Sequence, residues 1–198
     1  MELVFLGLLL LTSLVGGTVI IERALALRRS RVVPPEVVAA LQNCHGPADL
    51  PMVLKICQQK PSSLSRLVQV AAQHLEWPKA ENADAVQTRA RQEIVALERG
   101  LVILEITVGI APLLGLVGTV FGLMGLFGTL GASDVIQSNE LAKGISVILT
   151  ATLLGLLVAI PALIAWSYFN AKIQAMAVEM ESLCTEFLRR QYLRRNET

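Results

Sequence analysis

Charged and aromatic residues are scarce in this chain. Of its 198 residues, 17% are charged and 5% are aromatic, whereas 54% are hydrophobic, and the mean hydropathy is +0.59. This balance argues against a soluble globular domain and is typical of an integral membrane protein. The net charge of +1 gives no reason to expect a nucleic-acid partner.

The chain also lacks the motifs of soluble enzymes and of metal sites. It has no phosphate-binding loop, no HExxH pair and no nucleophile elbow, so we expect no enzymatic activity and no cofactor. Cys44, Cys57 and Cys184 are far apart and lack metal-ligand spacing, which favours free, partly buried thiols and no metal. His45 and His74 lie in a turn and near a predicted helix end, where surface roles are expected. No strand signal, internal repeat or low-complexity segment is found, so the predicted fold is all-α.

Three stretches are apolar enough to cross a bilayer. Residues 3–21, 106–130 and 145–169 carry no charge, and a span needs roughly 20 apolar residues. Eleven basic residues separate the first stretch from the second, one separates the second from the third, and five follow the third. The positive-inside rule therefore predicts an outside N-terminus, a cytoplasmic loop over 22–98, an outer turn over 131–144 and a cytoplasmic tail over 170–198.

The first stretch could instead be a cleaved signal peptide. The only charge before it is Glu2, so the basic n-region is missing, and Ala24–Leu25–Ala26 imitates a cleavage site only loosely. We therefore predict an uncleaved membrane helix over residues 1–21.

The polar segments also have helical patterns. Prolines and capping residues predict helices over about 35–43, 50–59 and 64–75, with Ser62 or Ser63 as the cap of the last. A longer helix is predicted from about residue 82 straight into the second span. Beyond the third span, apolar residues recur at spacings of three and four from Ile173 to Gln191, so that span is predicted to continue as a helix well into the cytoplasm.

The second and third spans carry rows of small residues. On the second span the row is Gly115, Gly118, Gly122 and Gly125. On the third it is Gly144, Ala151, Gly155, Ala159 and Ala162, with Ile148 completing it. Small residues let membrane helices approach closely, so we predict that these two spans pack tightly together.

Hydroxyl side chains lie at membrane depth beside these rows. They are Thr119 on the second span and Ser146, Thr150 and Thr152 on the third. A membrane hydroxyl often donates only to a carbonyl one turn earlier on its own helix, which is a purely structural role. Together with the small-residue rows, these hydroxyls predict a polar seam between the two helices.

Two strings of residues carry a resemblance to a known family. APLLGLVGTVFG, over residues 111–122, and the pattern G-x(5)-T-A-T-x-x-G-x-x-x-A-I-P-A, over 144–162, resemble the two pore helices of the MotA/TolQ/ExbB proton channel family. The resemblance covers about residues 93–172 and is strongest to the ExbB-like and TolQ branches. It implies that residues 99–198 form the channel region.

The resemblance implies a function in the bacterial inner membrane. Such proteins form a homo-oligomeric ring, expected to be a pentamer, around a single-span partner similar to ExbD or TolR. That partner supplies a proton-binding aspartate, and a protein similar to TonB or TolA is a further candidate partner. The ring couples the proton motive force to periplasmic or outer-membrane work, such as transport of biopolymers or nutrients.

The resemblance also assigns roles to residues of this chain. Thr119 and Thr152 match the family's pore-facing threonines, and Pro112 and Pro161 match its helix prolines. Val147 stands where related proteins commonly have a glutamate. This departure leaves open an alternative function, a non-conducting structural ring that scaffolds a single-span partner.

A glutamate lies on the same helix face as Thr119. Glu98, Glu105, Pro112, Thr119 and Leu126 are spaced by seven residues, a spacing that drifts only about 20° per step. Glu105 is therefore about 21 Å along the helix from Thr119. We hypothesise that Glu105 lines the cytoplasmic exit of the proton path. The alternative is an interfacial acid that faces lipid headgroups or pairs with Arg99 or a neighbouring subunit.

Overall fold

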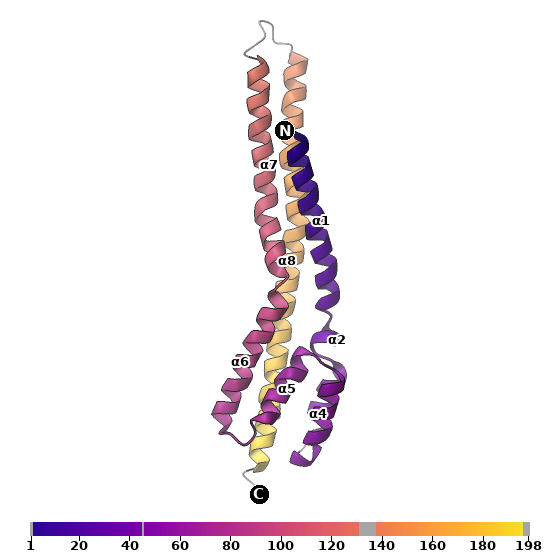
Figure 1. Cartoon of the computed structure of the whole chain (residues 1–198), viewed down its shortest axis with the longest axis vertical. Coiled ribbons are helices and arrows are strands. Elements are labelled where there is room, and N and C mark those ends of the chain that lie inside the picture. The colour runs from indigo at the N-terminus through magenta and orange to yellow at the C-terminus, as the bar shows by residue number, and fades with distance from the viewer. Residues whose placement is uncertain (1, 45, 131–137, 196–198) are drawn as a thin grey trace. The chain divides into compact units, whose positions relative to one another are not determined.

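The computed structural model describes residues 2–44, 46–130 and 138–195, and every regular element in these ranges is a helix. In chain order the elements are α1 (Glu2–Ala26), α2 (Arg29–Val32), α3 (Pro35–Gln42), η1 (Pro47–Asp49), α4 (Leu50–Gln59), α5 (Ser63–Gln73), α6 (Lys79–Glu98), α7 (Leu101–Leu130) and α8 (Ser138–Arg195) (Figure 1). The predicted all-α fold is confirmed for these ranges. His45 and residues 131–137 of the predicted outer turn lie outside them.

Within the described ranges, three helices are long and apolar enough to cross a membrane. They are Val4–Ala26 in α1, Leu101–Gly128 in α7 and Gly144–Leu193 in α8, in agreement with the three predicted spans. Helix α8 continues without a break to Arg195, so the third span does extend far beyond its apolar stretch.

The chain divides into two compact units, which we call the membrane unit and the loop–tail unit. The membrane unit is Met1–Arg23 with Gly100–Tyr168, and the loop–tail unit is Ala24–Arg99 with Phe169–Thr198. Helix α8 contributes its first part to one unit and its last part to the other. Each unit has its own core.

In the membrane unit, α1 packs along α7. The rings of Phe5 and Phe121 are 5.4 Å apart between centroids, within the range of favourable aromatic pairs. Further along, Gly16 faces Thr107, whose Cγ2 would lie 3.3 Å from a Cβ on the glycine. The small residue therefore lets α1 approach α7 at Thr107, which is buried.

The prediction of one continuous helix from residue 82 into the second span is wrong. Helix α6 ends at Glu98, and α7 begins at Leu101. Gly100 is a poor helix former, and the side chain of Arg23 occupies the space that a Cβ on Gly100 would need. The break removes Glu98 from the helix that carries Glu105, so the seven-residue row begins at Glu105.

In the loop–tail unit, α3, α4, α5 and α6 pack in sequence, each against the next. Ser62 caps α5 by accepting a hydrogen bond from the Ser65 amide at 3.1 Å, as predicted for this segment. The three cysteines of the chain are free and buried. Burial raises the pKa of the Cys57 thiol, which keeps it protonated and unreactive.

A buried amide joins three helices of this unit. Asn82, at the start of α6, is fully buried and donates to the Ala71 carbonyl at 2.9 Å and to the Tyr192 hydroxyl at 3.1 Å. Tyr192, on α8, donates in turn to the Trp77 carbonyl at 2.8 Å. Because an unsatisfied buried polar group is costly, this network specifies how α5, α6 and α8 meet.

A buried carboxylate provides a second polar interaction between helices of this unit. Glu93 accepts hydrogen bonds from Nε and Nη2 of Arg66 at 2.7 and 2.6 Å, and Arg89 lies 2.8 Å away on the same carboxylate. Burial raises the pKa of Glu93, but hydrogen bonds from Arg66 and Ser63 and the charges of Arg66 and Arg89 outweigh that effect. The pKa of Glu93 therefore lies below its ordinary value of 4.5.

This shift predicts how the stability of the loop–tail unit depends on pH. A depressed native pKa gives stability that is present above pH 4.5 and is lost as the pH falls through the native pKa. Glu93→Gln should lower the stability at pH 7 by about 1–3 kcal/mol. The difference from wild type should shrink below pH 4.5. Thermal unfolding in detergent, followed by circular dichroism, measures both effects.

Asp84→Asn is the matched control, because Asp84 lies exposed on the same helix beyond its first turn. It should leave the midpoint unchanged at every pH. If the two variants gave the same pH profile, the assigned role of Glu93 would be wrong.

Candidate functional site

Helices α7 and α8 touch backbone to backbone at Gly115 and Gly155. A Cβ on Gly155 would lie 2.6 Å from the Ala111 carbonyl oxygen and 3.2 Å from the Gly115 Cα. A Cβ on Gly115 would lie 2.9 Å from the Ala151 carbonyl oxygen. A flexible side chain could change its rotamer to make room for a Cβ, but backbone atoms of a helix cannot. Only glycine therefore fits at these two positions.

The same contact continues along both helices. Gly118 faces Ala151, and Gly122 faces Ile148, whose Cγ1 lies 2.7 Å from the position of a Cβ on the glycine. These pairs run forward along α7 and backward along α8, so the helices are antiparallel. Gly125 differs, because no described atom comes within 4 Å of where its Cβ would be. The prediction that Gly125 belongs to the packed row is therefore wrong for the described part of the chain.

Two threonines flank this contact. Thr119 is only 9% exposed, and its hydroxyl donates to the Leu116 carbonyl at 2.6 Å. Thr152 is half-buried, and its Cα lies 3.1 Å from the Cβ position of Gly115. No hydrogen bond joins the Thr152 hydroxyl to any residue in the described ranges. Thr119 is thus satisfied within its own helix, whereas Thr152 retains its hydrogen-bonding capacity.

The other two hydroxyls of α8 lie elsewhere. Ser146 and Thr150 are exposed, and the Thr150 hydroxyl donates to the Ser146 carbonyl at 2.8 Å. At 100° per residue, Thr150 is about 140° around the helix from Gly155. The structure therefore does not bring Ser146 or Thr150 into the contact between α7 and α8, and the predicted polar seam is limited to Thr119 and Thr152.

Glu105 and the two helix prolines complete the predicted set. Glu105 is exposed near the start of α7, and its carboxylate forms no ion pair with any described residue. Pro112 is half-buried, Pro161 is exposed, and both helices continue through these prolines. Each proline lacks an N–H and so leaves one carbonyl of its helix without the usual donor.

One buried hydroxyl was not among the residues predicted from the sequence. Thr107 is 4% exposed and donates to the Ile103 carbonyl at 2.8 Å. It precedes Ala111, Gly115 and Thr119 at steps of four residues, so the helical spacing could have revealed it. It serves the contact of α7 with α1, which the rows of small residues did not indicate.

These features define a class of protein. Three apolar helices, two of them joined by a glycine contact with polar groups at its margin, belong to a membrane protein built from close helix packing. Within the described ranges, no cluster of three or more His, Cys, Asp or Glu side chains could hold a metal ion.

Comparison with known proteins narrows the class to a family. A family profile matches residues 59–182, and the chain belongs to the MotA/TolQ/ExbB proton channel family. This family and the three apolar helices indicate a protein of the inner membrane. The resemblance seen in the sequence is thereby confirmed.

Individual relatives are similar over different lengths. A protein of Methanothermobacter thermautotrophicus described as an ExbB homologue is 30% identical over 159 residues, which are 80% of this chain and 56% of that protein. The biopolymer transport protein ExbB of Helicobacter pylori is 36% identical over 104 residues, or 50% of this chain and 72% of that one. The Tol-Pal system protein TolQ of Haemophilus influenzae is 31% identical over 103 residues, or 52% of this chain and 45% of that one. The chain thus spans about half the length of the first and the last of these relatives.

The glycine contact predicts a sharp difference between two substitutions. Gly155→Ala should destabilise the membrane unit by about 1–3 kcal/mol, because the added methyl group overpacks a contact lined by backbone. Gly125→Ala adds the same methyl group to open space and should leave the stability unchanged or slightly higher. Thermal unfolding of both variants in detergent measures the difference. Equal midpoints would show that α7 and α8 do not approach at Gly155.

Proposed function

We propose that this chain is a proton-channel subunit of an inner-membrane motor that couples the proton motive force to periplasmic or outer-membrane work. The observation that carries the proposal is the backbone contact of α7 with α8, which sets Thr119 and Thr152 at its margin in a chain of this family. Relatives named for biopolymer transport and for the Tol-Pal system support this class of work.

The hydroxyls suit a proton path for a chemical reason. A threonine hydroxyl can donate and accept a hydrogen bond at once, so it can hold water or a carboxyl group without itself carrying charge. The Thr152 hydroxyl has no partner in the described ranges, and an unsatisfied polar group at membrane depth is costly. A partner from outside this chain would remove that cost.

The proton-binding acid belongs to another chain in this proposal. Residues 106–130 and 145–169 contain no Asp or Glu, so neither span can bind and release a proton on a carboxylate of its own. We therefore infer a ring of this chain, expected to be a pentamer, around an ExbD- or TolR-like helix that supplies an aspartate. A TonB- or TolA-like protein would receive the resulting movement.

The orientation of the chain follows from its basic residues. Eleven of them lie between the first and second spans and five follow the third, against one in the turn between the second and third. This distribution supports an outside N-terminus and a cytoplasmic C-terminus. Protons would then flow from the Thr119 region toward Glu105.

Removal of the flanking hydroxyls tests conduction. Thr152→Val keeps the side-chain volume but deletes the hydroxyl, and it should lower proton flux by about tenfold or more if a hydrogen bond to the mobile proton or its carrier is lost. Thr119→Val should act in the same direction. Proton uptake into vesicles that contain the chain with its co-expressed single-span partner measures the effect.

Thr150→Val is the matched control, because Thr150 lies on the same helix outside the contact with α7. It should conduct more than Thr152→Val when both assemble equally. Full flux in Thr119→Val and Thr152→Val would contradict a path beside these residues.

Glu105 is proposed to line the cytoplasmic exit of this path. An ionisable residue at the margin of a span is a functional candidate, and the carboxylate of Glu105 has no ion-pair partner among the described residues. Glu105→Gln should lower proton flux severalfold while the complex still assembles. Glu98→Gln, which changes an acid on α6, should leave the flux unchanged. Unaltered flux in Glu105→Gln would favour an interfacial acid.

Val147 favours one alternative, a ring that scaffolds the single-span partner without conducting. An apolar residue stands there in place of the acid common in related proteins. The alternative predicts a stable complex with the partner and no proton flux in the wild-type protein. The same vesicle assay therefore separates the two functions.

A further inference from the structure

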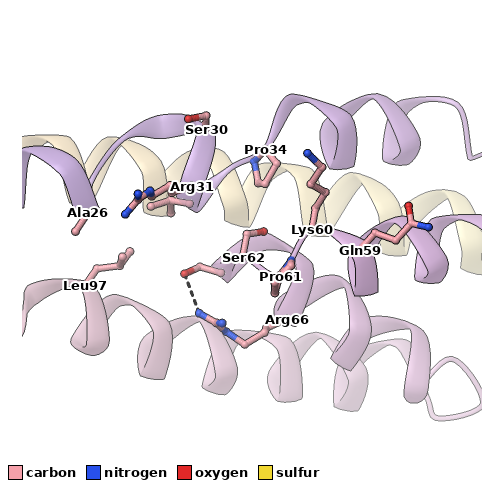
Figure 2. Close-up of a pocket in the computed structure, with 12 residues that line it drawn as sticks. Ala26, Ser30, Arg31, Pro34, Gln59, Lys60, Pro61, Ser62, Arg66 and Leu97 are labelled. Carbon is pink, nitrogen blue, oxygen red and sulfur yellow. Dashed lines mark hydrogen bonds between the residues drawn. The ribbon is translucent and has the colours of Figure 1, made fainter.

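The loop–tail unit contains a cavity whose lining includes no residue of the contact between α7 and α8. It has a volume of about 440 Å³, within the range of small-molecule sites. Arg31 of α2, Lys60 at the end of α4 and Arg66 of α5 lie around it, as Figure 2 shows. Ser30 and Ser63, whose side chains are hydroxyls, also line it. The lining thus combines three cations with neutral hydrogen-bond donors.

Ion pairs do not cancel the positive charge of this cavity. Arg66 shares the Glu93 carboxylate with Arg89, so two cations face one anion. Lys60 pairs with Glu36 at 3.1 Å, but both side chains are about half exposed, and such pairs are weak. The guanidinium of Arg31 has no carboxylate partner in the described ranges. The lining cations and the charged groups paired with them therefore carry a net charge of +2.

The first turn of α5 adds to this field. Pro61, Ser62 and Ser63 line the cavity, so the N-terminus of this 11-residue helix opens onto it. The first amides of a helix lack intrahelical acceptors and carry partial positive charge, which favours a phosphate or carboxylate. The N-terminus of α5 and the three cations thus favour the same class of ligand, an anion.

The remaining lining residues indicate which anion fits. Ala26, Val32 and Leu97 present apolar side chains, and none of the described lining residues is aromatic. A nucleotide would lack a stacking surface for its base, whereas a glycerol backbone with acyl chains would find apolar contacts. Ala26 is also the last residue of the candidate span Val4–Ala26, where phospholipid headgroups begin.

We propose that this cavity binds the phosphate group of an anionic phospholipid from the adjacent leaflet. Arg31 and Lys60 supply exposed cations, and Arg66, paired with Glu93, supplies a third. The lipid would join α2, α4 and α5 beside Ala26, which also lines the cavity. This site is independent of proton conduction, so neither proposal fails with the other.

A pair of matched double variants tests the site. Arg31→Gln with Lys60→Gln removes two cations from the cavity, whereas Arg28→Gln with Lys55→Gln removes two exposed cations that do not line it. Full-length protein in detergent is titrated with phosphatidylglycerol, phosphatidylcholine or inorganic phosphate. Native mass spectrometry counts bound lipid, and thermal unfolding reports stabilisation.

The proposal expects wild type to bind phosphatidylglycerol in preference to phosphatidylcholine. The cavity variant should lose roughly tenfold or more in phosphatidylglycerol affinity, and the control variant less than about twofold. Equal losses in both variants would mean a diffuse attraction to anionic membranes and would overturn the site. Stabilisation of wild type by inorganic phosphate at the same concentrations as the lipid would identify a free anion as the ligand and overturn the lipid assignment.

Discussion

The backbone contact between Gly115 and Gly155 is the constraint on which the membrane unit depends. Lipid tails are as apolar as leucine, so two membrane helices gain little from hiding apolar side chains from lipid and associate through close van der Waals packing instead. That packing needs glycine where the backbones meet. Once the contact is made, it determines which residues stand beside it, and Thr119 and Thr152 take those places. A single steric requirement thereby positions two polar groups of the membrane unit.

The loop–tail unit is stabilised differently, by buried polar groups that have hydrogen-bond or ion-pair partners. Its core buries the Asn82 amide and the Glu93 carboxylate, and each is stabilised by partners from other helices or from its own. Such groups are costly when unpaired, so they discriminate strongly between the native arrangement of helices and alternatives. The guanidinium groups that satisfy Glu93 outnumber it. Part of the excess positive charge around the cavity of this unit therefore follows from how the core is built, and Arg31 supplies the rest.

Some features of the fold were predictable from the sequence, and others were not. The spans, the helix caps and the small-residue row of Gly115, Gly118 and Gly122 follow from local composition and helical spacing, which a sequence displays directly. The break between Glu98 and Leu101 did not, because one glycine within a helical pattern does not by itself end a helix. Gly125 and Thr150 share the composition of their neighbours but not their surroundings. Spacing alone did not separate Gly125 from Gly122, whereas the 100° step of the helix does place Thr150 away from the face that carries Gly155.

The sequence by itself determined that this is an all-α membrane protein with three spans, and its motifs identified the family, because both are properties of local pattern. Only the tertiary structure decided which hydroxyls flank the contact of α7 with α8, where α6 stops, and that Arg31, Lys60 and Arg66 surround one cavity. These outcomes depend on which helix faces meet. That choice is a balance of backbone clearance and buried hydrogen bonds between residues distant in the chain, and no local pattern records it.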